Sequence, residues 1–216
     1  MKHPLKIINL GLPRSGTTTL ADALKATGFQ VADWRVDTDI PDSDGFVADL
    51  MYKGYFETGD PLALMPDYNA FTEISIVRNS KNIWPQMDYA LIAAITKYNP
   101  GTKFLLSHRN PAKLSDSMHR WSNLGKHRLP INDVPGMPAG YGGNDPEHIR
   151  WIEGHYAFCR RIFDGADNFL EYDLEDDQAP VHIGKFIGKE LDWWGKSNDH
   201  AYRVEKAKRA QERLQD

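Results

Sequence analysis

Residues 5–28 read LKIINLGLPRSGTTTLADALKATG, and this stretch decides the fold of the chain. Apolar residues at 5–10 predict a buried strand, a glycine-bounded turn follows at 11–16, and leucines at helical spacing then predict a helix that Gly28 ends. In such a strand–loop–helix unit, the backbone N–H groups of the loop and of the first helical turn converge on one place. The stretch therefore predicts a cradle for a phosphate or a sulfate.

The loop departs from the common phosphate-binding loop in one residue. That loop has two glycines, then lysine, then serine or threonine. Here Gly11 and Gly16 are followed directly by Thr17 and Thr18, and the nearest cation is Arg14. In nucleotide kinases and ATPases the missing lysine reaches the β- and γ-phosphates, so its absence argues against ordinary phosphoryl transfer from ATP.

The segment GLPRSGTTTL at 11–20 resembles the 5′-phosphosulfate loop of the sulfotransferases, in which Lys or Arg precedes SGTT after a strand. The resemblance implies that the donor is 3′-phosphoadenosine 5′-phosphosulfate (PAPS) and the product adenosine 3′,5′-bisphosphate. It also implies that Arg14 stabilises the charge that builds on the leaving phosphate. The loop residues that the resemblance assigns to donor binding are Pro13, Arg14, Ser15, Gly16, Thr17 and Thr18.

A second resemblance concerns the 3′-phosphate of the donor. Sulfotransferases bind it with an arginine just after a strand and a serine eight residues later in a helix. Residues 102–107 contain the apolar run 104–106 and predict a buried parallel strand, and Pro111 suits the first position of a following helix. Arg109 and Ser117 match the spacing, so the resemblance implies that they bind the 3′-phosphate.

The acceptor hydroxyl or amine loses a proton as it attacks sulfur, so the site needs a general base. Glu73, in the predicted strand at 68–74, is the first candidate and His108 the second. Two ordinary structural roles compete with these assignments. Glu73 could pair with a cation such as Arg78, and His108 could hydrogen-bond the backbone at a strand end.

The alternation of strands and helices indicates an α/β fold, a three-layer doubly wound parallel β-sheet with flanking helices. The resemblance implies the P-loop nucleotide-binding fold of the sulfotransferases. Because ligands bind at the carboxyl ends of the strands in such sheets, Arg14, Glu73, Arg109 and the residues after Asp173 are expected at one rim. Further strands are expected at 29–36 and 168–174, and helices at 46–55, 83–98, 111–121, 146–165 and 181–191.

The 216 residues are expected to form a single domain. Residues 124–145 contain many glycines and prolines without periodicity, which predicts a lid or an acceptor loop. The charged residues at 199–216 predict a helical tail at the surface.

Composition limits the partners. The chain is 41% hydrophobic and carries a net charge of −4, which argues against general nucleic-acid binding. No apolar run approaches the ~20 residues of a membrane span, so the expectation is a cytoplasmic protein without a membrane partner. The single cysteine, Cys159, cannot form an intramolecular disulfide, and no histidine or cysteine cluster suggests an obligatory metal. The acceptor is expected to be a small molecule or a glycan, and the oligomeric state is not indicated.

Two other functions stay open on the sequence. The chain could be a P-loop nucleotide kinase or NTPase with a degenerate Walker A loop, or a nucleotide-binding protein that kept the cradle without catalysing a reaction. The sulfotransferase interpretation accounts for the loop and for the Arg109–Ser117 spacing together.

Overall fold

A computed structural model of the chain describes residues 5–41, 43–78 and 81–195. Five parallel strands form its central sheet in the order β2-β3-β1-β6-β7. The winding of the chain reverses at β1, because β2 and β3 lie on one side of it and β6 and β7 on the other. The predicted α/β class with a doubly wound parallel sheet is therefore confirmed. The strands are β1 (Ile7–Asn9), β2 (Val31–Ala32), β3 (Ala70–Phe71), β6 (Lys103–His108) and β7 (Phe169–Asp173).

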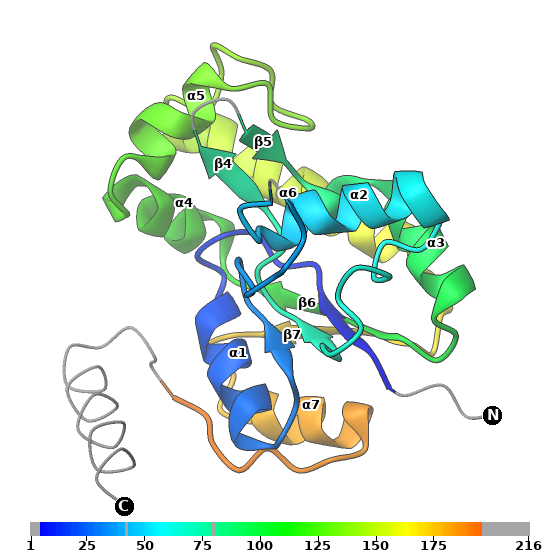
Figure 1. Ribbon diagram of the computed structural model, residues 1–216. Helices are drawn as coiled ribbons and strands as arrows, with labels where there is room; N and C mark the ends of the chain where they lie inside the picture. Colours follow the sequence, from blue (N-terminus) through cyan, green and yellow to red (C-terminus); the bar gives the residue numbers. More distant parts are fainter. Residues whose placement is uncertain (1–4, 42, 79–80, 196–216) are drawn as a thin grey trace, which may run out of the picture.

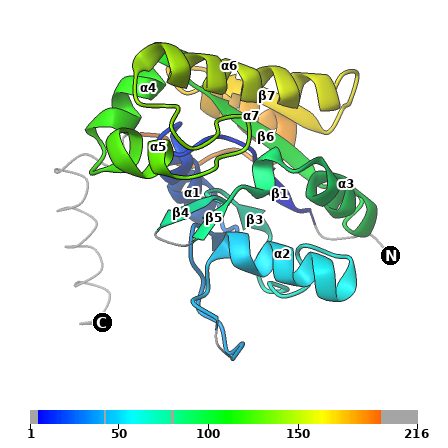
Figure 2. The same cartoon turned by 90° about the horizontal axis from the view of Figure 1, so that it is seen from above.

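Helices cover both faces of this sheet (Figures 1 and 2). Neighbouring strand residues point to opposite faces, so Ile7 packs with Leu20 of α1, whereas Ile8 belongs to the core with Met51 of α2. One face carries α1 (Thr17–Ala26) and α7 (Ala179–Ile187). The other carries α2 (Val47–Thr58), α3 (Tyr89–Tyr98), α4 (Pro111–Arg120) and α6 (Asp145–Ile162).

The prediction of a helix at 83–98 is wrong for residues 83–88. Residues 81–83 form β5 (Lys81–Ile83), which pairs antiparallel with β4 (Ile76–Arg78), and η1 (Pro85–Met87) follows. Helix α3 begins only at Tyr89, because Asp88 caps it by accepting a hydrogen bond from the backbone N–H of Ala90. The helical spacing of apolar residues began at Ile83, the last residue of the hairpin, which concealed the end of β5.

The second strand is shorter than expected, with two paired residues. The chain leaves the sheet after Ala32, since Asp33 accepts a hydrogen bond from the Thr72 hydroxyl and Trp34 has a φ of 60°. The turn places the side chains that follow β2 beside those that follow β3.

The segment at 124–145 is partly helical, with η2 (Leu124–Arg128, a π-helical turn) and α5 (Leu129–Ile131). Buried residues, among them Val134 and Met137, pack it against the main core, while its function as a lid stays a prediction. Helix α6 begins at Asp145, one residue before the expected start, and Asn144 caps it by accepting a hydrogen bond from the Glu147 N–H. The predicted tail at 199–216 lies outside the described residues. Within the part of the chain that the structure describes, no helix has both the length and the apolar character of a membrane span.

Candidate active site

A cavity of about 1400 Å³ opens at the carboxyl edge of the sheet. Every strand of the sheet is followed by residues that line this cavity, as expected for a doubly wound fold. Arg14, Glu73 and Arg109 therefore lie at one edge of the sheet, as the order of the elements predicts. The lining residues that follow the five strands include Arg14 after β1, Asp33 after β2, Glu73 after β3, Arg109 after β6 and Leu174 after β7.

Asn9, at the end of β1, holds the glycine-bounded loop in place. Its side-chain oxygen accepts hydrogen bonds from the N–H groups of Gly11 and Ser107, at 3.2 and 3.3 Å. Its amide nitrogen donates to the carbonyl of Thr72 at 2.9 Å. The buried amide therefore ties the loop to both neighbouring strands, which gives it one conformation.

Gly11 is a sensitive point of this loop. A β-carbon there would lie 1.8 Å from the Ser107 Oγ and 2.6 Å from the Ser15 Oγ, so Gly11→Ala is expected to destabilise the protein by about 1–3 kcal/mol. Gly154, in α6, has open space around it, and Gly154→Ala is the matched control, expected to stabilise by about 0.5–1 kcal/mol. Urea unfolding of both variants measures the difference, and equal stabilities would contradict the close approach.

The loop residues assigned to donor binding divide into two groups. Ser15 is buried, its Oγ lies 2.6 Å from the Ser107 Oγ, and its N–H donates to the carbonyl of Leu12. Ser15 therefore fastens the loop and does not line the cavity. The residues that do line it are Pro13, Arg14, Gly16, Thr17 and Thr18.

The structure brings the two predicted anion sites together. The Arg109 Nη1 donates to the backbone carbonyl of Arg14 at 3.3 Å. The Arg14 Nε donates to the Ser117 Oγ at 3.4 Å, and its guanidinium lies 4.0 Å from the centre of the Trp121 ring. All four residues line the same cavity, so the positive charge of both sites faces one space.

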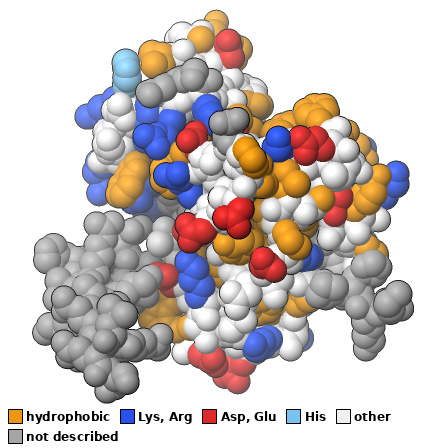
Figure 3. All heavy atoms as spheres, in the orientation of Figure 1, with side chains coloured by type: hydrophobic (Ala, Val, Ile, Leu, Met, Phe, Trp, Pro, Cys, Tyr) orange, Lys and Arg blue, Asp and Glu red, His pale blue; other side chains and the backbone are white. Residues whose placement is uncertain are grey.

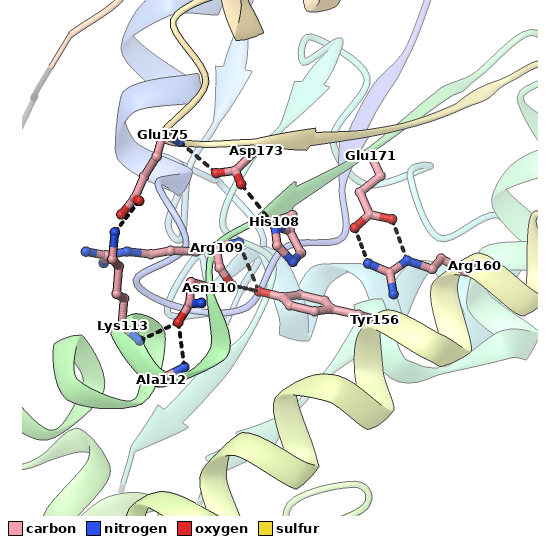
Figure 4. A network of polar contacts seen from close by, with 10 residues as sticks. All are labelled: His108, Arg109, Asn110, Ala112, Lys113, Tyr156, Arg160, Glu171, Asp173 and Glu175. Carbon is pink, nitrogen blue, oxygen red and sulfur yellow. Dashed lines mark hydrogen bonds and ion pairs between the residues drawn. The ribbon is translucent and has the colours of Figure 1, made fainter.

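Tyr156, on α6, holds the backbone of Arg109 (Figure 4). Its hydroxyl accepts from the Arg109 N–H at 3.2 Å and donates to the Arg109 carbonyl at 3.0 Å. Burial raises the pKa of Tyr156 to about 12, so the phenol keeps its proton at neutral pH and both bonds persist. The Nε of Arg109 is buried and has no hydrogen-bond partner among the described residues, which leaves it able to bind an anion.

Glu73 lies in the cavity wall as a partly buried carboxyl group. Its Oε1 accepts from the Ser75 Oγ at 2.6 Å and from the Ser75 N–H at 3.1 Å. Burial raises the pKa of Glu73 to about 7, and the nearby Asp33 carboxylate also raises it, while the bonds from Ser75 lower it. Glu73 can therefore exchange a proton near neutral pH, as a general base must.

His108 is not among the residues that line the cavity. Its Nδ1 lies 3.6 Å from the Asp173 Oδ2, and its ring centre is 4.8 Å from that of Tyr156 (Figure 4). The structure thus brings Glu73 together with the anion sites, and leaves His108 beside β7.

Backbone strain is concentrated at this cavity. Among the described residues three non-glycine residues have a positive φ, namely Arg14 at 73°, Trp34 at 60° and Ser122 at 50°. All three line the cavity. Such conformations cost about 1–3 kcal/mol each and cluster at functional sites, where surrounding contacts impose them.

A family model described as "Sulfotransferase domain" matches residues 6–132, more than half of the chain. The match spans the loop, Glu73, Arg109 and Ser117. The chain belongs to the sulfotransferase family. A solved sulfotransferase from Alicyclobacillus acidocaldarius is similar in structure, with 12% sequence identity, a TM-score of 0.48, and coverage of 94% of this chain and 89% of that one. A comparison with curated proteins found no match.

Two residues of this sulfotransferase site were not singled out from the sequence. Asp33 lies inside the strand expected at 29–36, and it reaches the same edge as Glu73 because β2 ends at Ala32. Leu174 directly follows Asp173 and lies at the rim that the order of the elements predicts. Its contact with the loop had no signal in the sequence, because it joins distant parts of the chain. Its Cδ1 would lie 2.4 Å from a β-carbon placed on Gly16. No group of three or more metal-ligating side chains occurs among the described residues, and independence from metal stays a prediction.

Proposed function

We propose that this sulfotransferase transfers a sulfuryl group from PAPS to a hydroxyl or an amine of a small-molecule or glycan acceptor. One observation carries the proposal: the glycine-bounded loop with Arg14 borders the same cavity as Arg109 and Ser117, and the Arg109 guanidinium contacts the loop backbone at 3.3 Å. Two neighbouring anion sites of this kind suit the 5′- and 3′-phosphates of one adenosine.

The chemistry of the cavity fits this donor. Its backbone N–H groups at the start of α1 suit the 5′-phosphate, and the Nε of Arg109, which has no hydrogen-bond partner within the described part of the chain, suits a second anion. A volume of about 1400 Å³ exceeds the roughly 300–1,000 Å³ of a typical ligand pocket, which leaves room for an acceptor beside the donor.

The residues suggest a mechanism of in-line transfer. PAPS supplies an activated sulfuryl group when bound. The loop N–H groups and Arg14 stabilise the negative charge that develops on the 5′-phosphate oxygen as the bond to sulfur breaks. Glu73 takes the proton from the attacking hydroxyl or amine, and Ser75 orients its carboxylate through the bond at 2.6 Å.

Isothermal titration calorimetry tests this function against the two rivals. Adenosine 3′,5′-bisphosphate is expected to bind without magnesium at least about tenfold more tightly than 5′-AMP, since one more phosphate is contacted. Tighter binding of ATP with magnesium, followed by hydrolysis, would instead identify an NTPase. Tight binding of the bisphosphate without sulfation of any acceptor in a broad panel would identify a non-catalytic binding protein.

A further inference from the structure

A second pair of arginines lines the cavity apart from the proposed donor site. Arg78 ends β4, and Arg128 ends η2. The Arg128 Nη1 donates to the carbonyl of Val77 at 2.8 Å, which holds this guanidinium against β4. Figure 3 shows Lys and Arg side chains gathered at the upper left of the visible face, with carboxylates nearer its centre.

The two guanidinium groups have no counter-ion among the described residues, where neither forms an ion pair. Arg120, another arginine of this cavity, differs because its Nη2 lies 2.6 Å from the Asp116 carboxylate. The Nε of Arg128 is buried without a hydrogen-bond partner among the described residues, and Arg109 has the same feature in the proposed 3′-phosphate site.

The positive charges of Arg78 and Arg128 repel each other. Burial lowers the pKa of Arg128 and the charge of Arg78 lowers it further. An anion placed between the guanidinium groups would offset the repulsion and supply the missing hydrogen-bond acceptor. The geometry of a basic pair facing a cavity, with a buried unsatisfied donor, is that of an anion site.

The position of the pair indicates which ligand carries the anion. Under the proposed function, the donor phosphates occupy the loops after β1 and β6. Arg78 belongs instead to the segment after β3, which also carries the proposed base Glu73 and its partner Ser75. The Arg78 guanidinium also lies 5.8 Å from the ring centre of Trp34, a partly exposed aromatic surface on the same cavity.

We infer that Arg78 and Arg128 bind an anionic group of the acceptor, so that this sulfotransferase acts on an acidic substrate. The group is a carboxylate, a phosphate or a sulfate on the molecule whose hydroxyl or amine is sulfated. The inference rests on the proposed function for its link to the acceptor, but the anion site itself does not depend on it.

Inorganic sulfate is the probe for this site. Protein saturated with adenosine 3′,5′-bisphosphate is titrated with sodium sulfate against sodium chloride of equal ionic strength, and the melting temperature is followed. The wild type is expected to gain stability with sulfate, because binding to the native state raises the melting temperature. In Arg78→Gln the half-saturating sulfate concentration is expected to rise at least about tenfold.

Charge reversal sharpens the test. In Arg78→Glu the new carboxylate can pair with Arg128, so the sulfate response is expected to disappear. The melting temperature without sulfate is expected to exceed that of Arg78→Gln. Arg161→Gln, at an exposed position of α6, is the matched control for loss of one positive charge and should respond as the wild type.

The outcomes separate the anion site from the donor site. A wild-type sulfate response in Arg78→Glu, or no response in the wild type, would overturn the anion site. A loss of bisphosphate affinity in Arg78→Gln of about tenfold or more would assign the pair to the donor and overturn the acceptor assignment. If the wild type bound no bisphosphate, the proposed function would fail. The same titrations without nucleotide would still decide the anion site.

Discussion

Replacing Arg109 with Ala is expected to weaken binding of adenosine 3′,5′-bisphosphate by about 10- to 100-fold, the loss typical of a charge-assisted hydrogen-bonding partner. The reason is that this guanidinium borders the cavity and its Nε has no hydrogen-bond partner in residues 5–41, 43–78 and 81–195, which suits the 3′-phosphate. Binding of 5′-AMP, which lacks that phosphate, is expected to weaken by about threefold at most, through the lost bond to the Arg14 carbonyl. Calorimetry with both nucleotides measures the two losses.

A matched control is Arg160→Ala. Arg160 forms an ion pair with Glu171 in the neighbouring network of Figure 4 and does not line the cavity. Its removal should leave both nucleotide affinities unchanged. Equal losses for the bisphosphate and for 5′-AMP in Arg109→Ala would count against the 3′-phosphate assignment.

Glu73→Gln is expected to lower turnover by about 10²- to 10⁴-fold, because the amide cannot accept the acceptor's proton. Donor affinity should stay within about twofold of the wild type, as Glu73 is not assigned to the donor phosphates. The wild-type value of kcat/KM should rise as the pH increases through about 7, where the carboxylate forms, and this rise should be absent in the variant. A variant that kept the wild-type rate would remove Glu73 as the base.

The same carboxyl group predicts a pH-dependent stability. Because folding raises the pKa of Glu73 to about 7, the native state favours the protonated form. Its stabilising effect is full below the pKa of the unfolded chain and is lost as the pH rises through about 7. Thermal unfolding at about pH 5 and pH 8 should therefore show Glu73→Gln gaining on the wild type at the higher pH.

Glu57→Gln is the control for that measurement. Glu57 is an exposed residue of α2 in an ion pair with Lys53, and its replacement should not show the same gain at high pH. An identical pH response in both variants would show that the effect does not come from the buried position of Glu73.

Much of the fold could be predicted because its signals are local. The strand expected at 102–107 is observed as β6, and Pro111 begins α4 as expected, because these signals come from propensity and capping alone. The β4–β5 hairpin was missed because each strand has only three residues and Ile83 also fitted the helical spacing of the segment that follows. Only the hydrogen bonds between the two short strands distinguish the alternatives.

The amino-acid sequence by itself determined the α/β class, the glycine-bounded loop between strand and helix, and the spacing of Arg109 and Ser117, since each depends on residues close together in the chain. Tertiary structure alone decided that Ser15 faces Ser107 and that His108 lies outside the cavity lining, beside Asp173. It also decided that Arg128 is bonded to β4 at Val77, next to Arg78. These outcomes depend on which distant segments pack together. Burial in that packing raises the pKa of Glu73. It also leaves the Nε atoms of Arg109 and Arg128 without hydrogen-bond partners among the described residues.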